Sequence, residues 1–262
     1  VRVVVRGCRR SMSRPARRST LAEQHTPRAI AKRLASAREP SYLHDFIYGA
    51  IDGAVTTFAV VAGVQGAQLD ETVVIILGVA NLIADGFSMA VSNFLGTRAE
   101  RQRREQTRDE ELRQIREFPE GEREEIRQIF RAKGFDGDDL ERIVEVITAD
   151  EELWLDTMMS EEHGLSETYP DELRAAASTF VAFVAVGAIP LLTFAYDLLI
   201  GEVADPFLWS AVLTGVAFFV VGALKAPFVG RSWVRSGLET LAIGGLAATL
   251  AYFTGVLLQN VG

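Results

Sequence analysis

The sequence predicts an all-α membrane protein with five transmembrane helices and a helical cytosolic insert between the second and the third. Five apolar stretches reach the length of about 20 residues that a helix needs to cross the hydrocarbon of a bilayer. Mean hydropathy is only +0.15 because these stretches alternate with two charged regions, residues 1–45 and about 98–174. The apolar stretches cover residues 46–67, 73–95, 175–200, 207–224 and 238–258.

Residues 1–41 form a basic tail that is rich in Arg and Ser, with Glu23 and Glu39 as its acidic residues. This composition predicts a disordered cytosolic segment near anionic lipid headgroups. Two alternatives are an organellar transit peptide and a start site at Met12. The single cysteine, Cys8, excludes an intrachain disulfide and a cysteine-based metal cage.

The first two spans, within residues 42–97, place carboxylates at membrane depth: Asp52 in the first and Asp85 in the second. An ionisable residue inside a membrane is a functional-site hypothesis by default. Asn81, Asp85 and Met89 follow one another at four-residue intervals, so they share one helix face. This stripe predicts an ion path. The alternatives are a polar packing role for Asp52 and a gap-filling role for Met89.

The short loops differ in charge on the two sides of the membrane. The turns at residues 68–72 and 201–206 contain no Lys or Arg, whereas the tail, the insert and the loop around residues 225–235 are basic or contain basic residues. Because the cytosolic side carries the Lys and Arg excess, the N-terminus and the insert are predicted to be cytosolic. With five spans, the C-terminus lies outside.

Residues 98–174 contain about two dozen acidic and about a dozen basic residues, which predicts a separate acidic helical domain. Its first helix continues the second span and stops at Phe118-Pro119, since the residue before a proline disfavours helix. A second helix follows at about 121–132 and ends at Gly134. Asp136 offers an N-cap for a third, and a fourth covers about 150–163.

Candidate metal ligands in this insert are carboxylates and thioethers. Glu100 and Glu111 are eleven residues apart and share a helix face, while Met158 and Met159 lie on the last helix. This mixture of hard and soft ligands suits a borderline ion such as ferrous iron. The alternative is a solvated acidic helix with the two methionines in the core. The run at 136–139 does not match an EF-hand calcium loop.

Residues 175–262 contain the third to fifth spans. Pro190 predicts a kink in the third span. Trp209 and Trp233 lie near span ends, where aromatic belts are expected. Glu239, just inside the fifth span, is expected to extend to the interface or to pair with Arg235.

Short motifs follow one another over residues 42–258: DFIYGAIDG at 45–53, TTF at 56–58, AGV at 62–64, GFSMA at 86–90, FP at 118–119, AKGF at 132–135, WLDTMM at 154–159, EHGL at 162–165, IPLL at 189–192 and GALK at 222–225. Together they resemble the vacuolar iron transporter family. The resemblance implies a homodimer of five-span subunits with an ion path at the dimer interface and the insert as a metal-binding domain.

In the membrane, the resemblance assigns Asp52 as the membrane aspartate, Met89 as the pathway methionine and Asp45 as an acidic residue at the cytosolic mouth. The pathway glutamate of many members falls at Asn81, and Asp85, one turn further on, is placed to supply that carboxylate.

In the insert, the family's four-glutamate pattern falls on Glu100, Arg103, Glu111 and Gln114, so two carboxylates are missing. Its ligands on the last helix fall on Met158, Met159 and Glu162.

The predicted function is transport of a divalent metal, ferrous iron with manganese as a further candidate, out of the cytosol by proton antiport. The alternative is a membrane-anchored metal sensor or scaffold. No enzyme is predicted, because the chain lacks a phosphate loop, HExxH and the Glu-x-x-His pairs of di-iron sites.

The expected partners are a second copy of the chain, Fe2+ or Mn2+ as substrate, protons and the lipid bilayer. No nucleic acid and no tightly bound cofactor is expected. The preference for Arg over Lys points to a bacterial plasma membrane rather than an organellar one.

Overall fold

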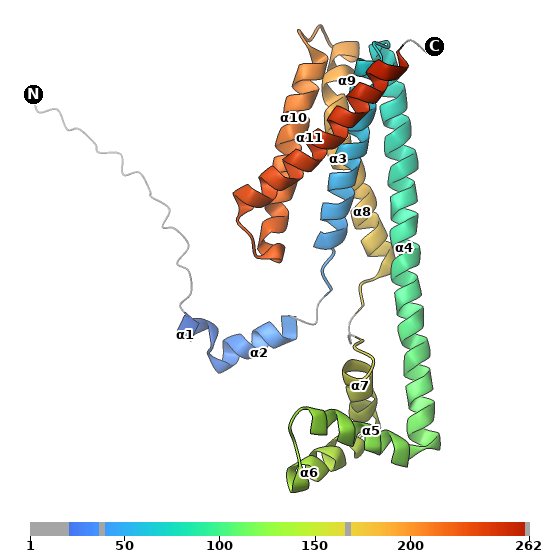
Figure 1. The fold of residues 1–262 in the computed structure, drawn as a ribbon, viewed down its shortest axis with the longest axis vertical. Coiled ribbons are helices and arrows are strands. Elements are labelled where there is room, and N and C mark those ends of the chain that lie inside the picture. Colours follow the sequence, from blue (N-terminus) through green and yellow to red (C-terminus); the bar gives the residue numbers. More distant parts are fainter. Residues whose placement is uncertain (1–20, 37–39, 166–168, 260–262) are drawn as a thin grey trace, which may run out of the picture. The chain divides into compact units, whose positions relative to one another are not determined.

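A computed structural model describes residues 21–36, 40–165 and 169–259. Within this part of the chain the protein is helical throughout, with no strand (Figure 1). Five helical segments are long and apolar enough to cross a membrane, which confirms the predicted number of spans. They are α3 (Leu43–Gly66), α4 (Glu71–Glu117), the pair α8 (Glu172–Gly187) and α9 (Leu192–Leu199), α10 (Pro206–Val229) and α11 (Trp233–Leu258).

The N-terminal tail, residues 1–39, is a unit of its own. It contains α1 (Leu21–Gln24) and α2 (Pro27–Ser36), where the sequence predicted disorder. The second helix has a local cause, because the backbone N–H of Ala29 donates to the Thr26 hydroxyl at 3.3 Å and Pro27 opens the first turn. The predictions for Cys8, Met12 and Glu39 concern residues outside the described part.

Close backbone contact joins α3 to α8. A Cβ atom added to Gly49 would lie 2.3 Å from the carbonyl oxygen of Thr179, and one added to Gly53 would lie 2.3 Å from that of Phe183. Both pairs are four residues apart, so one helix lies along the other through two successive turns. Small residues permit this approach, as in other membrane helix pairs. On another side, α3 packs against α11.

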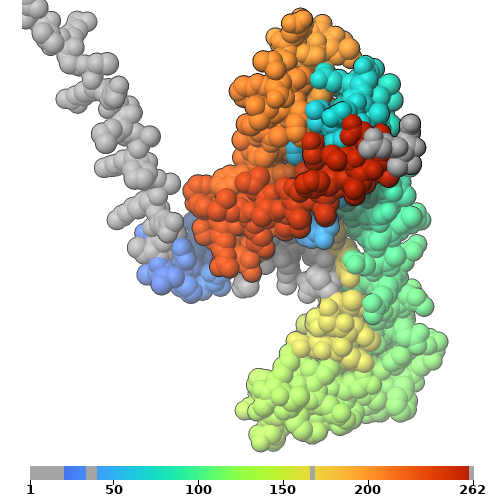
Figure 2. Space-filling model, turned by 45° about the horizontal axis from the view of Figure 1, so that its top comes forward, coloured from blue at the N-terminus to red at the C-terminus, as the bar shows by residue number. Residues whose placement is uncertain are grey.

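The long helix α4 connects the membrane part to the insert, as predicted. It runs unbroken to Glu117 and is followed by α5 (Pro119–Ala132), α6 (Gly137–Thr148) and α7 (Glu151–Glu161), which packs back against α4. Figure 2 shows these helices as one lobe continuous with α4. The core of this lobe includes Ile126, Trp154, Leu155, Met158 and Met159, all at most 4% exposed.

The third span is interrupted at Pro190, as predicted. Helix α8 ends at Gly187, and a 3-10 turn, η1 (Ile189–Leu191), precedes α9. The Ser210 hydroxyl of α10 donates to the Pro190 carbonyl oxygen at 2.6 Å, which satisfies a polar group near the break. For Glu239 the sequence predicted either extension to the interface or pairing with Arg235. Its carboxylate instead accepts a hydrogen bond from Arg231, at 3.2 Å, in the turn before α11.

Replacing Gly53 by alanine is expected to lower the stability of the protein by roughly 1–3 kcal/mol, because the new methyl group meets rigid backbone of α8. Gly96→Ala is the matched control, since no atom outside its own helix lies within 4 Å of the added Cβ. Thermal unfolding in detergent checks the pair. Equal melting temperatures for the two variants would contradict the close contact.

Candidate functional site

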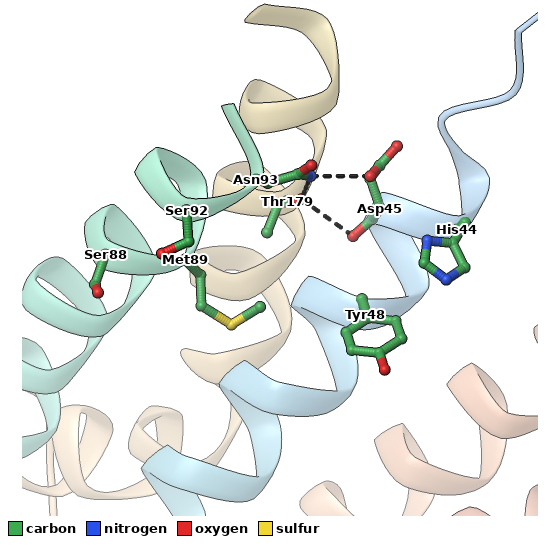
Figure 3. Close-up of a pocket in the computed structure, with 8 residues that line it drawn as sticks. All are labelled: His44, Asp45, Tyr48, Ser88, Met89, Ser92, Asn93 and Thr179. Atoms are coloured by element: carbon green, nitrogen blue, oxygen red, sulfur yellow. Dashed lines mark hydrogen bonds between the residues drawn. The ribbon is translucent and has the colours of Figure 1, made fainter. Parts of the chain in front are cut away.

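A pocket of about 290 Å³ opens between α3, α4 and α8 near the N-terminal end of α3 (Figure 3). Its lining combines carboxylate, hydroxyl, amide, imidazole and thioether groups, all of which can bind a cation or position a ligand. The lining residues are His44, Asp45, Tyr48, Ser88, Met89, Ser92, Asn93 and Thr179.

Asn93 is the centre of the hydrogen bonding in this pocket. Its side-chain nitrogen donates to Oδ1 of Asp45 at 2.9 Å and to the hydroxyl of Thr179 at 2.7 Å. The Thr97 hydroxyl donates to the amide oxygen of Asn93 at 3.2 Å, which sets the direction of the amide. Asn93 therefore joins three helices and orients the carboxylate of Asp45 (Figure 3).

Asn93 was not among the residues predicted from the sequence, although its spacing carries a signal. Asn93 lies four residues after Met89 and so extends the stripe of Asn81, Asp85 and Met89 by one more turn. Thr179 carried no such signal, because its relation to Asp45 exists only through the packing of α8 on α3.

Asn81, the first residue of the stripe, also faces α3. The side-chain nitrogen of Asn81 donates to the hydroxyls of Thr56 and Thr57, each at 3.3 Å. The Thr56 hydroxyl in turn donates to the backbone carbonyl of Asp52 at 2.9 Å. Because the amide nitrogen is used in this way, the amide oxygen is the atom of Asn81 that remains suited to bind a cation.

Asp52 and Asp85 lie close enough for their negative charges to repel each other. Asp52 is half-buried, whereas Asp85 is exposed within the apolar stretch of α4. Ile76, Ile83 and Phe87 are exposed too, but helical geometry places them on the opposite side of α4 from Asp85. Only 22% of the most apolar part of α4 is buried within this chain. The structure thus leaves the Asp85 carboxylate uncovered by the rest of the chain.

The insert contains a second polar cluster, where the end of α7 meets α4. Nε2 of His163 lies 2.9 Å from Oε1 of Glu111 and 3.8 Å from Oε2 of Glu162. One ligand atom from each of these three residues falls within 4.8 Å of the others, a spacing that can hold a metal ion. Of the predicted ligands, Glu111 and Glu162 are therefore brought together, and His163 joins them.

The remaining predicted ligands of the insert lie elsewhere. Glu100 shares a face of α4 with Glu111, but the eleven residues between them correspond to about 16 Å along the helix axis, and Glu100 is exposed. One ion cannot bind both. Met158 and Met159 pack in the hydrophobic core of the insert, which is the alternative that the sequence left open.

Glu122 of α5 borders this cluster and is only 3% exposed. Burial, with smaller contributions from the negative charges of Glu125, Glu111 and Glu162, raises the pKa of Glu122 to about 7, and His163 partly opposes the shift. Burial also raises the pKa of Glu125, and Glu162 adds to the effect. Neighbouring positive groups of the protein therefore compensate only part of the negative charge in this part of the insert.

This charge predicts a pH dependence of the insert's stability in chelator-treated protein. A carboxyl group whose pKa is higher in the folded than in the unfolded chain stabilises the fold at low pH. That stability is lost as the pH rises from about 4.5 to about 7, and it is on the order of 3 kcal/mol for Glu122. Amide hydrogen exchange of α5 measures it. Glu122→Gln is expected to reduce the slope, and an unchanged slope would contradict the assignment.

Comparison with known proteins gives a consistent result over nearly the whole membrane part and insert. The family model described as "VIT family" matches residues 43–256. The chain is 32% identical over 221 residues to "Vacuolar iron transporter 1" of Arabidopsis thaliana, covering 83% of this chain and 86% of the relative.

Two further relatives have similar scores. The protein is 32% identical over 225 residues to "Vacuolar iron transporter" of Plasmodium falciparum, covering 83% of this chain and 82% of the relative. It is 33% identical over 229 residues to the protein of that name from Toxoplasma gondii, with 84% and 75% covered. With five membrane-spanning helices and a match that extends from the first span to the last, the chain belongs to the VIT family, the vacuolar iron transporters.

Proposed function

We propose that this member of the family carries ferrous iron, and manganese as a second substrate, out of the cytosol in exchange for protons. The observation that supports this most directly is the placement of Asp52 and Asp85. These two carboxylates lie in membrane-spanning helices, and their negative charges repel each other. Carboxylates at that depth are expensive unless a cation or protons compensate them.

The path begins at the pocket around Asp45. Asn93 holds one oxygen of this carboxylate, and the hydroxyls of Ser88 and Ser92 and the thioether of Met89 line the same space. Oxygen ligands with one sulfur ligand suit a borderline divalent ion better than magnesium or calcium. From the pocket the ion passes along the stripe on α4 to Asp85 and Asp52, with the amide oxygen of Asn81 as a further ligand.

Proton exchange follows from the chemistry of the paired carboxylates. Two negative charges close together in a low-dielectric region are unfavourable. A bound divalent cation neutralises both, and after its release protons can take its place. Metal and protons therefore compete for the same groups, which couples their movements in opposite directions.

The proposed partner at the face of α4 that carries Asp85 is a second copy of the chain. Asp85 is exposed within the apolar stretch of this helix and would otherwise contact lipid. Association of two such faces removes both Asp85 carboxylates from lipid and places them beside a shared interior path.

The charge asymmetry of the loops supports a cytosolic N-terminus and a cytosolic insert in residues 98–174. There, the acidic insert raises the local concentration of cations near the pocket. A bacterial plasma membrane is the proposed location. A second candidate function, metal sensing without transport, draws on the buried glutamates of the insert.

Transport is tested by uptake of Fe2+ and Mn2+ into proteoliposomes, with and without an imposed pH gradient. Flux that depends on the gradient is expected for the unsubstituted protein. Asp52→Asn and Asp85→Asn are expected to reduce it to the level of empty liposomes, because each removes one charge that compensates the ion. Glu202→Gln, in the loop between α9 and α10, is the control and is expected to keep full flux. Metal binding without flux in the unsubstituted protein would favour the sensor.

Asn93→Ala is expected to lower flux about tenfold, because the Asp45 carboxylate loses a hydrogen bond that contributes about 1.5 kcal/mol. Thr107→Val is the matched control, since it removes a hydroxyl of the same helix that donates to the Arg103 carbonyl outside the pocket and leaves both bonds that Asn93 donates. Initial rates at subsaturating Fe2+ distinguish the two. If both variants transport equally well, Asn93 does not position Asp45.

A further inference from the structure

Helix α2 (Pro27–Ser36) of the N-terminal tail is amphipathic. With 3.6 residues per turn, its apolar positions lie within about 100° of one another around the helix axis. They are Pro27, Ile30, Ala31 and Leu34. The basic residues occupy the other half of the helix and are Arg28, Lys32 and Arg33. The tail therefore has an apolar face in addition to the positive charge that predicted its proximity to lipid headgroups.

The sequence around α2 is basic without interruption. Residues 24–38 contain Arg28, Lys32, Arg33 and Arg38 and no Asp or Glu. Arg28 and Lys32 are exposed, so an anionic partner can reach both. A basic amphipathic helix of low overall hydrophobicity is typical of helices that lie in the plane of the membrane interface.

We propose that α2 is a lipid-binding helix that lies in the membrane interface. Its apolar face, with Ile30 and Ala31, enters the boundary between headgroups and acyl chains, while Arg28 and Lys32 contact the headgroups of anionic phospholipids. The inference goes beyond the proposed transport and does not depend on it.

The short connection to α3 keeps α2 within reach of the bilayer. Only residues 37–42 separate the end of α2 from Leu43, and a segment of that length spans at most about 20 Å. The 24 residues of α3 extend over about 36 Å. Because the hydrocarbon core is about 30 Å thick, both ends of α3 reach the interfacial layers. Tethering of this kind strengthens a weak binding helix, since its target is always nearby.

The acidic insert is the other anionic surface that α2 could meet, and two observations favour the membrane. Ile115, in the core of the insert, lies twenty residues beyond the apolar stretch of α4 that ends at residue 95, or about 30 Å along the helix. This distance is longer than the connection of about 20 Å. The bilayer also covers the apolar face of α2 at the same time as it compensates the basic face.

The test uses the full-length protein with its single cysteine removed by Cys8→Ser. A nitroxide label is attached to Ala29→Cys in one sample and to Ala31→Cys in another, because these alanines lie on the basic and the apolar side of α2. Each sample is placed in nanodiscs of phosphatidylcholine alone or of phosphatidylcholine mixed with anionic phosphatidylglycerol. Nanodiscs expose both leaflets, so the result does not depend on the orientation of the protein.

EPR measures the collisions of each label with oxygen, which concentrates among acyl chains, and with a water-soluble nickel chelate. In anionic nanodiscs the label at Ala31→Cys is expected to favour oxygen and the label at Ala29→Cys to favour the chelate. In phosphatidylcholine alone, both labels are expected to favour the chelate, because the basic face loses its partner.

Substitutions separate the contributions of charge and of apolar contact. Arg28→Gln and Lys32→Gln are each expected to lower the ratio of bound to free helix about fivefold. Ile30→Ser is expected to lower it at least about tenfold. Arg142→Gln is the matched control and should leave the ratio unchanged, since it removes an exposed charge on α6 of the insert.

Equal collision rates at the two labels in anionic nanodiscs would overturn the proposal. An oxygen preference at Ala31→Cys that persists undiminished in phosphatidylcholine would also overturn it, because anionic headgroups would then play no part. Labels that are immobilised in both lipids without access to oxygen would overturn it in favour of docking on the insert.

Discussion

The close contact between α3 and α8 is the constraint on which the membrane part depends. Because Gly49 and Gly53 have no side chains, the carbonyl groups of Thr179 and Phe183 reach the backbone of α3. This brings Thr179 to Asp45, and the hydroxyls of Thr56 and Thr57, one turn after Gly53, accept hydrogen bonds from Asn81 of the stripe on α4. A wider helix separation would break the hydrogen bonds that Asn93 donates to Asp45 and Thr179, because their lengths of 2.9 Å and 2.7 Å require close contact.

The length of α4 couples the membrane part to the insert. One uninterrupted helix carries Asp85 and Met89 in the span and Glu111 in the insert. Glu111 and the proposed ion path therefore lie on the same helix. Helix α7 holds the insert to α4. Its Met158 and Met159 pack in the hydrophobic core of the insert.

The two polar sites follow the same physical logic. Each collects carboxylates in surroundings that disfavour their charge: Asp52 and Asp85 by membrane depth, and Glu111 and Glu122 by burial in the insert. Protein partners leave part of this charge uncompensated. On the proposed function, such sites favour a divalent cation over a monovalent one, because a single divalent ion offsets two carboxylates at once. The two sites differ in their other ligand atoms: a thioether lies near the first, and an imidazole is part of the second.

Much of this could be read from the sequence, and the remainder has a clear physical cause. Apolar length determined the five spans, the pair Phe118-Pro119 determined where α4 ends, and four-residue spacing placed Asp85 and Met89 on one face, because these properties are local. Local spacing could not distinguish a shared face from a shared site: Glu100 and Glu111 face the same way but are too far apart along the axis. Thr179, Glu122 and His163 entered their sites only through tertiary packing. Each meets partners from distant segments, and no periodicity within one helix records which residue of another helix will lie opposite.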